Sequence, residues 1–202
     1  TAVYLSKYYT CETGIAAMIK RLLNTAQAIR AIDTDKAVSW VQDQLAFTLA
    51  GKQAEAVADA ARSKVMVITG GPGTGKTTII RAVLTIFARL KINIKLAAPT
   101  GRAAKQMSAA TGAAASTIHR MLSFNAAGGG FQKNADNLLD CDLLIVDEAS
   151  MIDTVLMYHL LKAVPPQATL ILVGDVNQLP AVGAGNVLDD IIASAKLPVI
   201  RL

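Results

Sequence analysis

The spacing of apolar positions differs between the first third of the chain and the rest. In the alanine-rich stretches 12–31 and 36–62, apolar residues recur every three to four positions, which is the spacing of a buried helix face. Asp33 or Thr34 can cap the second of these helical stretches. We therefore predict a helical lead-in over residues 1–50 that packs on the main domain.

After the lead-in, short apolar runs alternate with helical patterns. Each run ends abruptly at a glycine, a proline or an acidic residue, which is typical of strands buried on both faces of a parallel sheet. Alternation of strands and helices predicts an α/β fold with right-handed crossovers. The apolar runs are 65–68, 94–97, 143–146 and 170–173, and the helices are expected near 75–90, 102–110 and 153–164.

The remaining organisation follows from length and composition. With 202 residues the chain has the size of one ordinary domain, and we assign the α/β domain to residues 51–202. A polar stretch near 123–137 contains three consecutive glycines and is expected to project as a loop or hairpin. The chain starts on Thr1, so we expect it to be part of a longer protein.

Several features predict a cytoplasmic protein with no membrane segment. No apolar window approaches the roughly 18 residues of a membrane helix, and the first residues do not form a signal peptide. Cys11 and Cys141 lie far apart without a CxxC pattern, which excludes a disulfide scaffold and a zinc cluster and suits a reducing compartment.

Positive charge is concentrated in the middle of the chain. The net charge is +5, yet residues 64–139 hold ten basic and one acidic side chains, a local charge of +9. Such a segment favours a polyanion, either nucleotide phosphate or nucleic acid. Basic residues scattered over solvated faces are an equally weighted alternative on charge alone.

Residues 70–77 match the phosphate-binding pattern GxxxxGK[ST] at every fixed position. The segment follows an expected strand and opens an expected helix, so that its backbone N–H groups can wrap a phosphate. Lys76 is expected to bridge the β- and γ-phosphates of ATP, and the Thr77 hydroxyl to bind Mg²⁺. The expected nucleotide contacts are Gly71, Pro72, Gly73, Thr74, Gly75, Lys76, Thr77 and Thr78.

A second chemical pattern follows the apolar run 143–146, which ends in Asp147 and Glu148. Asp147 is expected to hold Mg²⁺ through its water shell, and Glu148 to orient and deprotonate the attacking water. Adjacent carboxylates repel unless a cation lies near them. A nucleotide kinase would not need this glutamate, and the sequence lacks the Asn-Lys-x-Asp motif of a GTPase.

Together with these two patterns, further segments resemble the superfamily 1 helicases, and most closely the RecD/TraA group. Residues 98–105 resemble the group's motif for single-stranded DNA, and residues 116–120 resemble the next nucleic-acid motif. Residues 147–150 have the group's form of the acidic box, and residues 174–180 with 182–185 resemble its third motif. The resemblance implies a RecA-like P-loop NTPase domain with a central, mostly parallel sheet flanked by helices.

The resemblance also implies roles for individual residues. Gln53 falls where the family keeps a glutamine that reads adenine, and Gln178 falls where a glutamine senses the γ-phosphate and couples it to DNA. The expected catalytic residues are Lys76, Asp147, Glu148 and Gln178. The expected DNA-binding residues are Pro99, Thr100, Gly101, Arg102, Lys105, Thr117, His119 and Arg120.

Aromatic residues make up only 4% of the chain, and no Phe, Trp or Tyr lies in these DNA motifs. Because base stacking on aromatic rings is common in single-strand binders, we expect contacts mainly to the DNA backbone with little sequence preference. His159 is expected to be structural.

We interpret the chain as the first ATP-binding motor domain of a DNA helicase in recombination or repair, with ATP and Mg²⁺ as cofactors. The resemblance implies 5′→3′ movement on single-stranded DNA and a second motor domain in the same parent chain, and it leaves open partner subunits of a nuclease complex. Two alternatives remain: a P-loop ATPase of another class, or a nucleotide-dependent DNA-binding module without turnover.

Overall fold

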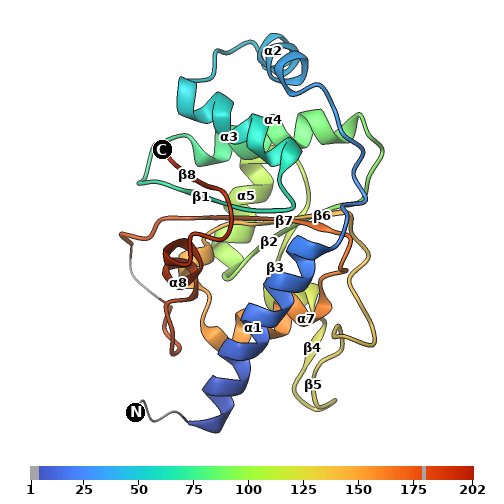
Figure 1. Cartoon of the computed structure of the whole chain (residues 1–202), viewed down its shortest axis with the longest axis vertical. Coiled ribbons are helices and arrows are strands. Elements are labelled where there is room, and N and C mark those ends of the chain that lie inside the picture. The colour runs from blue at the N-terminus through green and yellow to red at the C-terminus, as the bar shows by residue number, and fades with distance from the viewer. Residues whose placement is uncertain (1–4, 179–180) are drawn as a thin grey trace.

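A six-stranded parallel sheet runs through the centre of the molecule (Figure 1). The computed structural model describes residues 5–178 and 181–202. The strand order is β3-β2-β6-β7-β1-β8. The strands are β1 (Val65–Thr69), β2 (Ile94–Ala98), β3 (Ala115–Thr117), β6 (Leu143–Val146), β7 (Thr169–Gly174) and β8 (Val199–Arg201).

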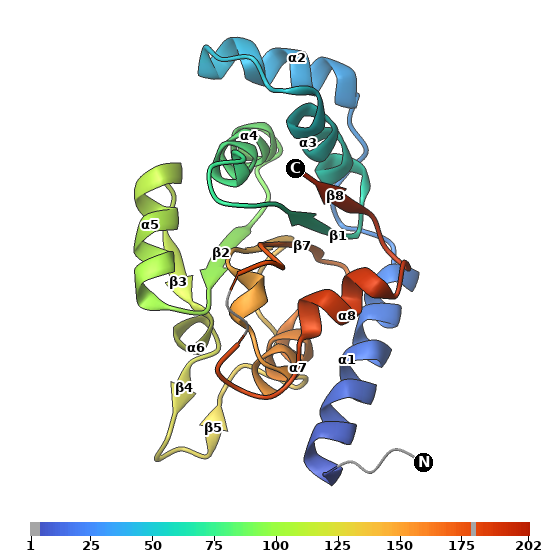
Figure 2. The same ribbon diagram turned by 90° about the vertical axis from the view of Figure 1, so that its left-hand side faces the viewer.

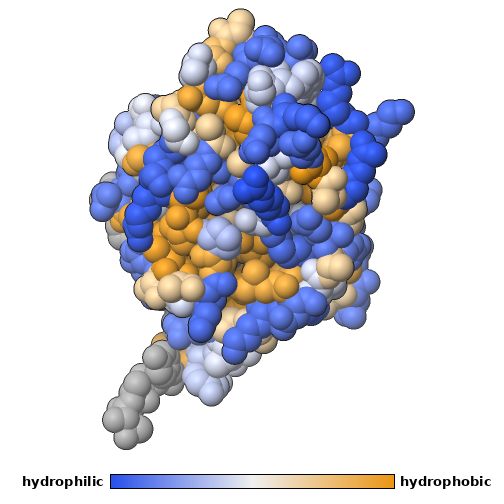
Figure 3. Space-filling model, turned by 45° about the horizontal axis from the view of Figure 1, so that its top comes forward, coloured by the Kyte–Doolittle hydropathy of each residue, from blue (hydrophilic) through white to orange (hydrophobic). Residues whose placement is uncertain are grey.

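Helices cover both faces of this sheet (Figures 1 and 2). Alternate residues of β1 show why: Val65 and Val67 belong to one apolar core, whereas Met66 and Ile68 belong to the other. The first core is closed by α1 (Ser6–Asn24), α6 (Ile118–Met121), α7 (Thr154–Ala163) and α8 (Val187–Ala193), and the second by α2 (Thr34–Leu45), α3 (Gly51–Arg62), α4 (Lys76–Ala88) and α5 (Gly101–Thr111). On the face that Figure 3 shows, hydrophilic side chains surround apolar areas.

The α/β class and the strands that the apolar runs predicted are confirmed, because each run coincides with β1, β2, β6 or β7. The predicted helices between them correspond to α4, α5 and α7. The polar stretch near 123–137 contains the antiparallel hairpin of β4 (Phe124–Asn125) and β5 (Gly130–Phe131), which extends away from the sheet (Figure 2). Apolar periodicity did not predict β3, β8 or α8.

The lead-in contributes helices to both faces of the sheet. Helix α1 packs on α7, whereas α2 packs on α3 and α4 across the sheet. The predicted cap of α2 is present, since the Asp33 carboxylate accepts a hydrogen bond of 3.1 Å from the backbone N–H of Lys36. The boundary at residue 50 between the lead-in and the α/β domain stays a prediction. None of the helices in the described part of the chain is both long and apolar enough to span a membrane.

Parallel pairing brings the carboxyl ends of neighbouring strands to one edge of the sheet. Thr69 of β1 lies opposite Gly174 of β7, and Ala98 of β2 lies opposite Thr117 of β3. The segments that follow these strands are therefore neighbours, although they are far apart in the sequence. Ligands of open α/β sheets bind at this edge.

Gly174 fixes how closely two of these strand ends approach each other. A Cβ atom at this position would lie 3.0 Å from the backbone nitrogen of Ser150 and 2.8 Å from Leu188 Cδ2. Ser150 belongs to the short 3₁₀ helix η1 (Ala149–Met151), which follows β6. Because backbone atoms cannot yield as a flexible side chain can, the close approach of β7 and η1 depends on a glycine here.

We predict that Gly174→Ala lowers the free energy of unfolding by about 1–3 kcal/mol, the usual cost of overpacking, as measured by urea denaturation. The matched control is Gly51→Ala, where a Cβ atom would meet nothing within 4 Å. Since alanine favours a helix more than glycine does, the control should be as stable as the wild type or more stable. An unchanged denaturation midpoint for Gly174→Ala would contradict the close packing.

Candidate functional site

Residues 70–75 form the phosphate loop between β1 and α4. The Thr74 hydroxyl donates a hydrogen bond of 2.9 Å to the Gly71 carbonyl, which closes the loop on itself. Gly75 then adopts a left-handed conformation with φ 91° and directs the chain into α4 at Lys76. The first N–H groups of a helix have no intrahelical acceptor, so this helix start presents free donors to an anion.

Lys76 folds back over the phosphate loop. Its Nζ donates hydrogen bonds of 2.6 Å to the Gly70 carbonyl and 2.9 Å to the Gly71 carbonyl. The ammonium group is thus held above the turn that the sequence pattern assigns to phosphate.

Gln53 of α3 touches the phosphate loop. Its side-chain Nε2 donates a hydrogen bond of 3.0 Å to the Thr74 carbonyl, and its Oε1 accepts one of 3.1 Å from the backbone N–H of Ala50. A Cβ atom at Gly75 would collide with the Gln53 amide. The amide therefore bridges the start of α3 and the loop.

The two carboxylates lie directly beyond β6. The Asp147 backbone N–H donates to the Ala97 carbonyl at 2.9 Å, and the Glu148 N–H donates to Asp147 Oδ1 at 2.9 Å. Glu148 itself adopts a left-handed conformation with φ 52°, which costs free energy for a residue with a side chain and persists only where the surrounding structure holds it. This turn aims the acidic pair at the edge of the sheet.

Burial raises the pKa of both carboxyl groups. For Asp147 the hydrogen bond from the Glu148 N–H and the charge of Lys76 oppose the rise. For Glu148 the charges of Asp147 and Asp175 raise the pKa further, again against Lys76. These effects show that the four charged groups share one electrostatic environment, in which negative charge is incompletely neutralised.

The chemistry of this acidic pair fits a magnesium ion. Within the described residues, Glu148 Oε2 is buried without a hydrogen-bond partner, and a metal-bound water would supply one. No cluster of three His, Cys, Asp or Glu side chains with metal-site geometry occurs in the described part of the chain. Mg²⁺ is usually held by one or two carboxylates, waters and substrate phosphates, and the acidic pair supplies two carboxylates.

A pocket of about 540 Å³ connects this acidic pair to the next helix. Thr77, Asp147 and Glu148 form one side of the pocket, and Gln106 and Met107 of α5 lie on the other. Gln106 did not emerge from the sequence motifs. The only signal for it is the helical spacing that places it one turn beyond Arg102, towards the strand edge.

Asp175 and Gln178 follow β7 at the same edge. Asp175 is buried, and its carboxylate accepts a hydrogen bond of 3.0 Å from the Asn177 N–H. The Gln178 N–H donates to the Asp175 carbonyl at 3.2 Å, and its side chain is exposed. Leu179 and Pro180, which also belong to the third motif, lie outside the described residues. Beyond them, the Thr154 N–H of α7 donates to the Ala184 carbonyl at 3.1 Å.

The expected DNA-binding residues lie at two neighbouring helix starts. The Thr100 hydroxyl caps α5 by accepting from the Ala103 N–H at 3.2 Å, and the Thr117 hydroxyl caps α6 by accepting from the Arg120 N–H at 3.2 Å. Pro99 directly follows β2, next to these caps. The exposed residues around them are Gly101, Arg102, Lys105, His119 and Arg120.

Aromatic rings lie closer to these residues than the sequence motifs indicated. The His119 ring packs against Phe124 and Phe131 of the hairpin, with ring centroids 5.7 and 5.5 Å apart. His159, which we expected to be structural, contacts Phe131 from α7. No local sequence signal joins these residues, because the hairpin and α7 meet only in the folded chain.

Comparison with known proteins shows the family to which this chain belongs. Residues 53–184 match the family model described as an AAA domain. The ATP-dependent RecD2 DNA helicase of Deinococcus radiodurans is 42% identical over 183 residues, covering 91% of this chain and 25% of the relative. The RecBCD enzyme subunit RecD of Haemophilus influenzae is 40% identical over 163 residues, covering 69% of this chain and 26% of the relative. The chain thus spans about a quarter of the length of these relatives.

A solved structure has the same fold. The crystal structure of Pif1 helicase from Candida albicans superposes with a TM-score of 0.55 at 19% identity, over 77% of this chain and 40% of that chain.

The raised pKa of Glu148 predicts a stability that depends on pH. Because the folded state favours the protonated form, ionised Glu148 destabilises the fold, and this cost appears as the pH rises above the ordinary value of 4.5. Glu148→Gln should therefore be more stable than the wild type at neutral pH without nucleotide or Mg²⁺, and the difference should vanish below that value. Urea denaturation at both pH values measures it.

The matched control for this measurement is Glu12→Gln, which changes an exposed glutamate of α1. It should stay within about 0.5 kcal/mol of the wild type at neutral pH. Equal stability of Glu148→Gln and the wild type at neutral pH would contradict the electrostatic cost assigned to Glu148.

Proposed function

Because the chain belongs to the AAA domain family and is a RecD-like member of it, we propose that it is the ATP-binding motor domain of an ATP-dependent DNA helicase. One observation carries this proposal: the phosphate loop, the acidic pair and the two capped helix starts share a single edge of the sheet. The pocket that joins Thr77, Asp147 and Gln106 links the first two features to α5. Nucleotide use by this domain is a property of its family.

We propose that the nucleotide is ATP, with its phosphates in the loop of residues 71–78 and Gln53 at the adenine. Lys76 would exchange its two loop carbonyls for β- and γ-phosphate oxygens. Thr77 and Asp147 would hold Mg²⁺, which neutralises developing phosphate charge when it is bound. Glu148 would orient the attacking water and accept its proton, a task for which a raised pKa makes a carboxylate a stronger base.

For the DNA, we propose backbone contacts at the starts of α5 and α6. Hydroxyl and N–H groups near Thr100 and Thr117 would take phosphates of a single strand, and Arg102, Lys105 and Arg120 would add charge. Phosphate contacts carry little sequence information, so binding should be nearly independent of sequence. Gln178 would sense the γ-phosphate and couple it to this DNA-binding surface.

The larger assembly is proposed from the relatives. A second motor domain in the same protein would complete the ATP site and allow 5′→3′ movement, with residues 1–50 as the lead-in to the motor of residues 51–202. One relative is named as a RecBCD subunit, so partner subunits of a nuclease complex are part of the proposal. DNA recombination or repair in the cytoplasm is the setting that this function implies.

The test is ATP hydrolysis by the intact protein with and without single-stranded DNA. We expect hydrolysis that requires Mg²⁺ and is stimulated by DNA. Lys76→Ala should lose binding of a fluorescent ATP analogue, since charge-assisted hydrogen bonds to the phosphates are lost. Lys52→Ala, which changes an exposed lysine of α3, is the matched control and should bind normally.

The outcomes separate the alternatives. Hydrolysis that DNA does not stimulate would favour a P-loop ATPase of another class. Binding of ATP and DNA without any turnover would favour a nucleotide-dependent DNA-binding module. Unchanged affinity of Lys76→Ala for the analogue would remove Lys76 from the site.

The proposed backbone contacts predict a salt-dependent affinity for single-stranded DNA. Arg102→Gln and Lys105→Gln should each reduce the slope of log affinity against log salt by about 0.7, the value for one phosphate contact of a single strand. Lys91→Gln is the control, since Lys91 is exposed just before β2 at the opposite edge of the sheet. A slope that neither variant changes, or a strong preference for one base sequence, would contradict these contacts.

A further inference from the structure

Four rings from three separate segments form a continuous cluster beside the proposed DNA surface. Phe124 and Phe131 pair across the hairpin of β4 and β5 with ring centroids 5.0 Å apart. His119 of α6 flanks both rings, and His159 of α7 lies 4.8 Å from Phe131. The ring cluster therefore leads from the end of β3, where Thr117 lies, to the surface of α7.

This ring cluster is partly open to solvent. Phe124 is 50% exposed, and few large apolar side chains of the described residues are as open. His119 is exposed as well, whereas Phe131 and His159 are half-buried. An apolar ring left this open contributes little to the core, which favours a role in contact with a ligand.

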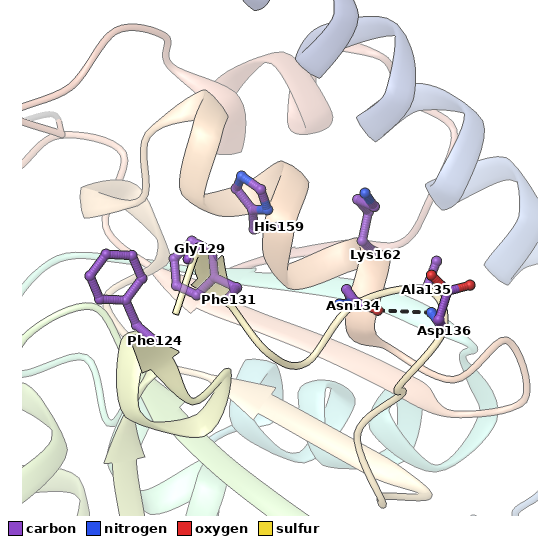
Figure 4. Close-up of a pocket in the computed structure, with 9 residues that line it drawn as sticks. Phe124, Gly129, Phe131, Asn134, Ala135, Asp136, His159 and Lys162 are labelled. Atoms are coloured by element: carbon purple, nitrogen blue, oxygen red, sulfur yellow. Dashed lines mark hydrogen bonds between the residues drawn. The ribbon is translucent and has the colours of Figure 1, made fainter. Parts of the chain in front are cut away.

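A pocket of about 360 Å³ lies between the hairpin and α7 (Figure 4). Phe124, Phe131 and His159 line one part of it, and Lys162 and Asp136 line another. Figure 4 shows His159 and Lys162 on the same helix, α7, and the loop that carries Asn134 and Asp136 beside it. The pocket thus offers aromatic faces at one end and a cation with polar groups at the other.

We propose that this pocket binds an unpaired nucleobase of single-stranded DNA, as a contact separate from the starts of α5 and α6. The inference rests on the proposed DNA function. It adds a site that contacts the face of a base, whereas the starts of α5 and α6 contact the phosphate backbone. The base would stack on the rings of Phe124 and Phe131. Its polar edge would meet the Asp136 carboxylate, and Lys162 would lie near a neighbouring phosphate.

The combination of groups favours a nucleobase over other ligands. A purely apolar ligand would make no use of the charged groups that Asp136 and Lys162 bring to the pocket. A simple anion would make no use of the rings. A nucleotide has a flat π face, hydrogen-bonding edges and a phosphate, and every base can stack on an aromatic ring.

The pocket is also continuous with the proposed DNA surface. His119 is adjacent to Arg120 and follows Thr117 by two residues, so one strand held at the start of α6 can reach the ring cluster without leaving the protein surface. The proposal therefore changes one expectation from the sequence: base stacking contributes to binding, although no Phe, Trp or Tyr lies within the DNA motifs.

The experiment compares an oligo(dT) strand with an abasic strand of the same length, using the intact protein. Phe124→Ala should weaken binding of oligo(dT) about ten-fold, within the range measured when a stacking ring is removed. It should leave binding of the abasic strand unchanged, because the backbone contacts remain. Phe124→Trp should keep the affinity for oligo(dT), whereas Phe124→Leu, which keeps apolar bulk without a π face, should not.

Leu5→Ala is the matched control, since Leu5 is an exposed apolar residue next to α1, and it should bind both strands normally. Equal weakening of both strands by Phe124→Ala, or full rescue by leucine, would overturn the stacking site. A wild-type protein that binds neither strand would contradict the proposed function itself, and the site with it. Normal wild-type binding with no effect of Phe124→Ala would contradict the site alone.

Discussion

Parallel strand pairing is the constraint on which the rest of this structure depends. Because β1, β2, β3, β6 and β7 run in the same direction, the segments that follow them meet at one edge. The phosphate loop, the acidic pair and the helix caps near Thr100 and Thr117 become neighbours for this reason alone. The two apolar cores stabilise the sheet from both faces, so the edge itself need not contribute stability.

Because the two cores stabilise the sheet, its edge can be electrostatically unfavourable in the protein without a ligand. Asp147 and Glu148 lie partly buried with raised pKa values, Glu148 Oε2 is buried without a hydrogen-bond partner among the described residues, and Glu148 has a left-handed backbone. Lys76 is the nearby positive charge that opposes both shifts, and it is held by loop carbonyls. A nucleotide with a divalent cation would offset the repulsion between the carboxylates and supply a hydrogen-bond partner for Glu148 Oε2, which explains how the site can prefer its ligand.

The sequence predicted the parts of the fold whose signals are local. Strands buried on both faces appear as uninterrupted apolar runs, so β1, β6 and β7 were recognisable, and the phosphate loop was identified by its own spacing. Strand β3 has three half-buried residues at the edge of the sheet, which leaves no apolar run to detect. Gln106 and the ring cluster depend on contacts between distant segments: α5 crosses the pocket beside Asp147, and the hairpin reaches α7. Such contacts leave no periodic pattern and no motif in the sequence.

If nucleotide and DNA bind at the same edge of the sheet, DNA binding should change the rate of ATP hydrolysis. Gln178 tests this most directly, because it follows β7 at that edge and its amide can exchange hydrogen bonds between γ-phosphate and water. The decisive measurement is steady-state ATP hydrolysis by intact Gln178→Ala protein, with and without single-stranded DNA. We expect affinities for ATP and DNA within a few-fold of the wild type and loss of most DNA stimulation. A variant that DNA still stimulates fully would show that Gln178 is only part of an exposed loop, and would contradict the proposed coupling.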